Sequence, residues 1–148
     1  FKRPGEINLM TNEGINALNE CIRALQSHPA LNPLAPSKAL SFAARDHVMD
    51  TGPKGILGHR GSDGSDIDRR INRYGSWDRS IGENISYGEN DAKDIVIQLI
   101  VDDGVPSRGH RKNIMAGKFQ YIGVSVGKHR RYGYLCVLDF ASEITDKL

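Results

Sequence analysis

Cysteine is scarce in this chain: Cys21 and Cys136 are the only two among 148 residues. Two thiols are too few for a disulfide-dense scaffold or for a zinc site built from several thiolates. Each lies in an apolar segment, which favours two buried free thiols, and a single bridge between them is the alternative. Cysteine usage therefore leaves the redox compartment open.

Charge of one sign and long apolar runs are also lacking. Lysine and arginine number 20 against 18 aspartate and glutamate residues, which gives a net charge of +2. Without a long basic run, or basic residues interleaved with aromatic ones, nucleic-acid binding has little support. No apolar stretch approaches the roughly 20 residues of a membrane-spanning helix. We therefore expect neither a nucleic-acid partner nor a transmembrane segment.

Length and composition are those of a single globular domain over residues 1–148. The hydrophobic fraction of 39% and the charged fraction of 26% are ordinary for a folded domain that buries its own core. The chain begins at Phe1 rather than at Met. A removed signal peptide and a trimmed end are both consistent with that start.

Helical periodicity dominates the first two thirds of the chain. Apolar residues at three- and four-residue spacing predict a helix over residues 15–25. After a proline-rich loop, Ser37 is expected to cap a second helix. Ser65, with Asp68 three residues later, resembles a capping box that opens a short helix. Asn90 is expected to cap another helix.

The end of the chain has the pattern of strands. Residues 121–126 and 134–140 are predicted to form two strands joined by a basic turn. The segment that contains Trp77 is predicted to be a loop that leads to Gly82. Helices followed by a hairpin predict an α+β fold, with helices packed on an antiparallel sheet.

The tripeptide Gly-His-Arg occurs twice and contributes His59 and His110, and a Gly-Glu-Asn sequence that contains Glu83 lies between the copies. A neutral imidazole is a nitrogen ligand for zinc or copper, and a carboxylate can coordinate the same ion or orient the imidazole. A lone histidine in a polar loop is usually only solvated. Two in the same tripeptide favour one site assembled by folding, and the glycine before each lets the backbone aim the side chain into a cleft.

Asp102 and Asp103 directly precede the loop to His110 and are candidates for a second carboxylate. Both lie at the C-terminal end of a predicted helix, where the helix dipole makes negative charge unfavourable. This misfit favours a role other than helix stability. No Gly-x-Ser-x-Gly sequence is present, so a serine hydrolase has little support.

Four motifs resemble, in this order, those of the CAP superfamily, which includes the cysteine-rich secretory, antigen-five and plant pathogenesis-related proteins. They are Gly58-His59-Arg60, IGENISYG at residues 81–88, SRGHRKNI at residues 107–114 and YIGV at residues 121–124. Each motif is short, but four in order are specific. The resemblance spans about residues 15–140 and is strongest to compact members without the disulfides of the animal proteins.

The resemblance implies a three-layer α-β-α sandwich with a central antiparallel sheet and a large open cleft. In the family, two histidines and two acidic residues face that cleft and often bind a divalent cation, commonly zinc. The matching positions here are His59, Glu83 and His110. The fourth position falls on Asp102 or Asp103, where aspartate is one methylene shorter than the family's glutamate.

The resemblance also implies a secreted, extracellular or periplasmic protein that acts as a binding or interaction module and not as an enzyme. Its partner would be a protein, a lipid or a sterol. Two alternatives stay open. One is a metal-dependent hydrolase with Glu83 as general base. The other is a lipid or sterol carrier whose apolar groove does the binding.

Overall fold

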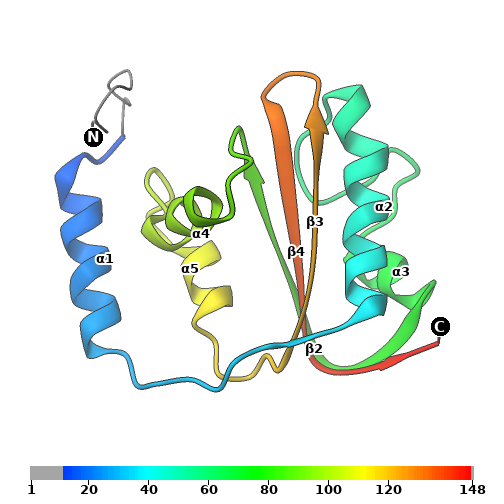
Figure 1. Cartoon of the computed structure of the whole chain (residues 1–148), viewed down its shortest axis with the longest axis horizontal. Helices are drawn as coiled ribbons and strands as arrows, with labels where there is room; N and C mark the ends of the chain where they lie inside the picture. The colour runs from blue at the N-terminus through cyan, green and yellow to red at the C-terminus, as the bar shows by residue number, and fades with distance from the viewer. Residues whose placement is uncertain (1–11, 148) are drawn as a thin grey trace.

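A computed structural model describes residues 12–147, in which a four-stranded sheet lies between two groups of helices (Figure 1). The elements are, in order, α1 Ile15–Ser27, β1 Ala35–Pro36, α2 Lys38–Lys54, α3 Ile67–Asn72, β2 Gly75–Tyr87, α4 Ala92–Val101, α5 Gly109–Ile114, β3 Tyr121–His129 and β4 Gly133–Asp146. This arrangement confirms the predicted α+β class and the α-β-α sandwich.

The strands are arranged in the order β1-β3-β4-β2. The three long strands are antiparallel, as predicted, and the two-residue β1 pairs in parallel with the start of β3. In the middle of the sheet, Glu83 of β2 lies opposite Asp139 of β4, which lies opposite Gly123 of β3. Strand β2 is therefore an edge strand, with Glu83 halfway along the pairing with β4.

The core lies on both sides of the sheet, because α2 and α3 cover one face and α4 and α5 the other (Figure 1). Successive residues of β4 point to the two faces. Val137 packs with Ala44 and Val48 of α2. Its neighbour Leu138 belongs to the cluster of Leu99 on α4. The near-continuous burial of β4 follows from its central place between two helical layers.

Helix α2 lies against β3 because β3 has a glycine at the point of contact. A Cβ on Gly123 would lie 2.1 Å from the backbone nitrogen of Ser41. The helix begins as predicted at Ser37, whose hydroxyl accepts the Leu40 N–H and donates to Asp146 at the end of β4. The N-cap thus joins α2 to the sheet.

Three local predictions were wrong. The N-cap of α3 is Asp66, not Ser65, and that of α4 is Asp91, not Asn90. The segment around Trp77 is not a loop but the first part of β2. This strand lacks clean alternation, because a register shift follows Asp78 and a residue there has positive φ, so only its pairing with β4 defines it.

Helix α1 lies outside α4 and α5 (Figure 1), and ion pairs join this part of the chain to the region of α5. Only Ala17 and Cys21 are buried, while much of the predicted apolar face is exposed. Glu20 forms an ion pair with Arg111 at 2.6 Å, and the carboxylate of Asp103 accepts backbone N–H groups at the start of α1.

Both cysteines are buried free thiols, which confirms the favoured interpretation. Burial raises the pKa of the Cys136 thiol to about 11 and also raises the pKa of Cys21. Within residues 12–147, no helix combines the length and the apolar character needed to cross a bilayer.

Candidate functional site: two histidine–carboxylate pairs at strand β2

The first pair joins the loop after α2 to strand β2. The Nδ1 atom of His59 lies 2.8 Å from Oε1 of Glu83. The histidine side chain is 59% exposed, whereas the glutamate side chain is 3% exposed. Because an ionised carboxylate only accepts hydrogen bonds, Nδ1 carries the proton of this contact, and in the neutral ring Nε2 then keeps its lone pair. Gly58 has the positive φ that its place before the histidine favours, at 95°, whereas before His110 it is Arg108 and not Gly109 that has positive φ.

Glu83 is held in its ionised form by its surroundings. Burial raises its pKa, but the hydrogen bond from His59 and the positive charge of Arg70 outweigh burial and lower the pKa to about 2. Asp139, directly opposite on β4, is fully buried, and burial together with the charge of Glu83 raises its pKa well above the ordinary value. The surroundings therefore shift the pKa values of the two facing carboxyl groups in opposite directions.

The second pair lies at the start of α5. The Nδ1 atom of His110 lies 2.7 Å from Oδ1 of Asp102, and the other carboxylate oxygen accepts the backbone N–H of His110 at 2.9 Å. Asp102 is 3% exposed and has the left-handed conformation, with a φ of 56°, directly after α4. Of the two candidate aspartates, Asp102 therefore contacts the histidine. Asp103 lies at the start of α1 instead.

Two consecutive residues of the edge strand contact the two pairs, one on each face of the sheet. Glu83 contacts His59 on the face covered by α2 and α3. Asn84 points to the opposite face, where its Nδ2 donates to the carbonyl oxygen of His110 at 2.9 Å and its Oδ1 accepts from Asn113 at 2.9 Å. Asn84 belongs to the IGENISYG motif, but it was not predicted to be a site residue.

The arginines of the two Gly-His-Arg copies differ. Arg111 is buried, and its guanidinium contacts Glu20 of α1 through two nitrogens and the carbonyl oxygen of Ile100 through the third. Arg60 is exposed. The sequence does not distinguish Arg111 from Arg60, because each directly follows a Gly-His pair.

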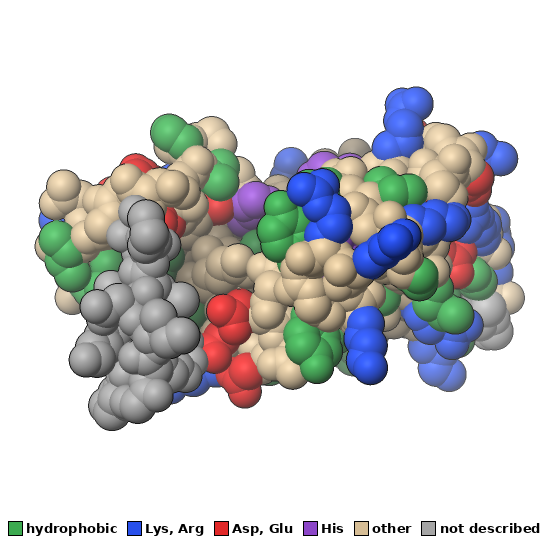
Figure 2. Space-filling view, turned by 90° about the horizontal axis from the view of Figure 1, so that it is seen from above, with side chains coloured by type: hydrophobic (Ala, Val, Ile, Leu, Met, Phe, Trp, Pro, Cys, Tyr) green, Lys and Arg blue, Asp and Glu red, His purple; other side chains and the backbone are tan. Residues whose placement is uncertain are grey.

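Within residues 12–147, no three histidine, cysteine, aspartate or glutamate side chains form a ready set of metal ligands. The site instead contains the imidazoles of His59 and His110. In each ring Nδ1 contacts a buried carboxylate, and Nε2 has no hydrogen-bonding partner among the described residues. This arrangement matches the carboxylate support that metal-binding histidines usually have. Figure 2 shows histidine side chains on the molecular surface, one of them beside an acidic side chain at the margin of a hollow.

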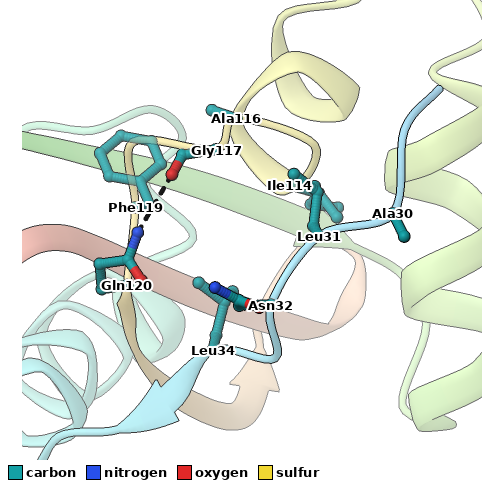
Figure 3. Close-up of a pocket in the computed structure, with 9 residues that line it drawn as sticks. All are labelled: Ala30, Leu31, Asn32, Leu34, Ile114, Ala116, Gly117, Phe119 and Gln120. Carbon is teal, nitrogen blue, oxygen red and sulfur yellow. Dashed lines mark hydrogen bonds between the residues drawn. The ribbon is translucent and has the colours of Figure 1, made fainter.

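A separate pocket of about 220 Å³ lies between the loop that follows α1 and the segment that joins α5 to β3 (Figure 3). At its polar side, Gln120 donates to the carbonyl oxygen of Gly117 at 3.1 Å. Neither His59 nor His110 lines it. Its apolar walls come from Leu31, Leu34, Ile114 and Phe119.

Comparison with known proteins gives the family. The sequence profile of the cysteine-rich secretory protein family, CAP, matches residues 15–140. The chain belongs to this family, which confirms the resemblance drawn from the four motifs. It is 31% identical over 106 residues to YkwD, an uncharacterised protein of Bacillus subtilis (strain 168). The aligned part is 71% of this chain but 39% of YkwD, so the chain spans about two fifths of that relative.

Solved structures share the fold. An outer surface protein of Borrelia burgdorferi has a TM-score of 0.62 at 19% identity, covering 91% of this chain and 95% of its own. An extracellular protein of Bacillus anthracis that contains an SCP domain has a TM-score of 0.59 at 18% identity, covering 93% and 45%. A cysteine-rich secretory protein of Staphylococcus aureus has a TM-score of 0.56 at 18% identity, covering 97% and 42%.

Proposed function

We propose that this CAP domain is an extracellular binding module that holds a divalent cation between the Nε2 atoms of His59 and His110. The observation that supports the proposal is the matched pair of histidine–carboxylate contacts, which leaves one free nitrogen on the exposed ring of His59 and one on the half-buried ring of His110. The extracellular location is supported by the fold neighbours, described as outer-surface, extracellular or secretory proteins.

In this proposal the histidines are the ligands and the carboxylates support them. Glu83 and Asp102 accept the Nδ1–H of each ring, which fixes the ring and makes Nε2 a better donor to a metal. Zinc suits imidazole nitrogen, and two protein ligands leave its other positions to water or to a group from a partner. Such an open site fits a module that binds through its cation.

A hydrolase that uses Glu83 as general base is less well supported. A general base works best with a pKa near the operating pH. The pKa of Glu83 is lowered to about 2, and both of its oxygens already have partners, His59 and Arg70. A carrier role remains a second candidate because the pocket at Phe119 has apolar walls. Lipid extracted from the purified protein would support that role, and loss of the lipid in a variant that fills the pocket would locate it.

Calorimetric titration with zinc tests the cation proposal. We expect one zinc ion per wild-type chain, weaker binding in His59→Ala or His110→Ala, and none in the double variant. His28→Ala is the matched control, because His28 contacts only the carbonyl of Pro29, and its zinc affinity should equal that of the wild type. Unchanged affinity in the double variant would refute the site.

A further inference from the structure

We propose that Arg70 is a positioning residue that fixes both the location and the ring orientation of His59. The effect on cation affinity rests on the function proposed above, but the effect on the imidazole does not. Arg70 belongs to the short helix α3, and its side chain is 1% exposed. Both terminal nitrogens of the guanidinium have partners, whereas its buried Nε has none among the described residues, so the partners of Nη1 and Nη2 indicate what the side chain holds.

The guanidinium of Arg70 contacts the His59 pair at two points. One nitrogen, Nη1, donates to the carbonyl oxygen of His59 at 3.0 Å and lies 3.4 Å from that of Ser65. The other, Nη2, donates to Oε2 of Glu83. The first contact holds the loop backbone at His59, and the second holds the carboxylate that accepts from the His59 ring.

These contacts determine which oxygen His59 meets. Since Nη2 binds Oε2 of Glu83, the carboxylate is fixed with Oε1 toward His59 Nδ1. Without Arg70, the carboxylate can rotate and the loop carbonyl loses its donor. The ring then has no fixed acceptor for Nδ1–H, and nothing favours the tautomer with a free Nε2.

Among the described residues no arginine side chain binds the Asp102 carboxylate, since Arg108 donates to the backbone carbonyl oxygen of Asp102 and not to its side chain, and this gives an internal control. The carboxylate of Asp102 is fixed by the backbone N–H of His110 and by its own place after α4. Removal of Arg70 should therefore change His59 and leave His110 unchanged. A general loosening of the fold would change both.

The test is nitrogen-15 NMR of the histidine rings in the metal-free protein at about pH 8, above the ordinary imidazole pKa of about 6.5. In the wild type we expect the Nδ1–H tautomer at both His59 and His110. In Arg70→Met, His59 should change to a mixture in which Nε2–H is abundant, with His110 unchanged. Arg73→Met is the matched control, because Arg73 lies just after α3 but forms half-exposed ion pairs with Asp46 and Asp63.

Retention of the Nδ1–H tautomer at His59 in folded Arg70→Met would overturn the inference. If that variant does not fold, Arg70→Lys decides, because lysine keeps the charge but cannot bridge two acceptors as the planar guanidinium does. A wild-type His59 signal in Arg70→Lys would then overturn it, and a mixed tautomer would support it.

Zinc titration separates this inference from the proposed function. Loss of a supporting partner typically weakens metal binding by about 10–100-fold, and we expect that loss in Arg70→Met. If the wild type binds no zinc, the proposed function fails, while the tautomer of His59 still decides the role of Arg70. If the wild type binds zinc and the tautomer is unchanged in Arg70→Met, only the role of Arg70 fails.

Discussion

The two Gly-His-Arg copies allow a matched test, because Arg111→Met and Arg60→Met make the same chemical change at positions of opposite burial. Arg111 is 6% exposed, and its side chain donates to Glu20 at 2.7 and 2.6 Å and to the carbonyl of Ile100 at 2.6 Å. A further bond reaches the carbonyl of Val101 at 3.2 Å. Arg60 is exposed, and no described residue forms an ion pair with it.

The expected loss follows from these contacts. Glu20 is 41% exposed, so solvent limits the ion pair to about 1 kcal/mol or less. The carbonyl groups of the half-buried residues Ile100 and Val101 lose their charged donor, although the Cys21 thiol still lies 3.5 Å from the Ile100 oxygen, and each lost partner costs about 1–3 kcal/mol. We therefore expect Arg111→Met to lose about 2–7 kcal/mol of unfolding free energy. Arg60→Met should stay within about 0.5 kcal/mol of the wild type.

Guanidinium unfolding followed by circular dichroism measures both variants, and calorimetry provides a second value. At about 2–4 °C per kcal/mol for a chain of this size, Arg111→Met should lower Tm by roughly 4–28 °C. Glu20→Gln should lose no more than about 1 kcal/mol, because the carbonyl contacts of Arg111 remain. Equal stability of Arg111→Met and Arg60→Met would show that the contacts of Arg111 contribute little.

Three further predictions concern the core. Gly123→Ala should lose several kcal/mol of unfolding free energy in a denaturant titration, because its Cβ would overlap the α2 backbone at 2.1 Å. Gly117→Ala should lose little, because the nearest atom to its Cβ would lie at 3.6 Å. Equal losses in the two variants would contradict this packing. Burial raises the pKa of Asp139 in the folded protein. As pH rises above the ordinary pKa of 3.8, the unfolded chain therefore releases a proton that the folded protein still holds, and the free energy of unfolding decreases. The Asp139→Asn variant should not show this decrease in stability with rising pH. Parallel pH curves for the variant and the wild type would exclude the proton of Asp139 as the cause of the decrease. Cys21 and Cys136 should react with a thiol reagent only after denaturant is added, and rapid labelling of the native protein would show that they are accessible.

Helix type and the terminal hairpin could be predicted from the sequence because periodicity and caps are local. Ser37 was identified as an N-cap from its own position, and the structure bears this out. Strand β2 was missed in its first part because polar residues and a register shift hide its period, and long-range pairing with β4 defines it. Strand assignment there depends on tertiary context more than on propensity.

The site was predictable as a set of residue types but not as a set of contacts. The choice between Asp102 and Asp103 depends on the left-handed turn at Asp102, which sends that carboxylate toward His110 and the next one toward α1. Arg70 gave a faint signal, since it lies three residues after Ile67 on the apolar side of α3. Its partners come from a loop and a strand, and no spacing rule connects them.

The adjacency of Glu83 and Asn84 has a consequence for how this domain can vary. Alternate residues of a strand point to opposite faces, so inserting or deleting one residue before Glu83 within the paired part of β2 would exchange the two side chains. The carboxylate would then face α5, and the amide would face His59. The loop that carries His59 and the loop that precedes His110 have no such alternation, so they can lengthen without exchanging the two faces. Among relatives, length differences should therefore accumulate in the loops, and between residue 81 and the end of β2 they should be absent or come in pairs.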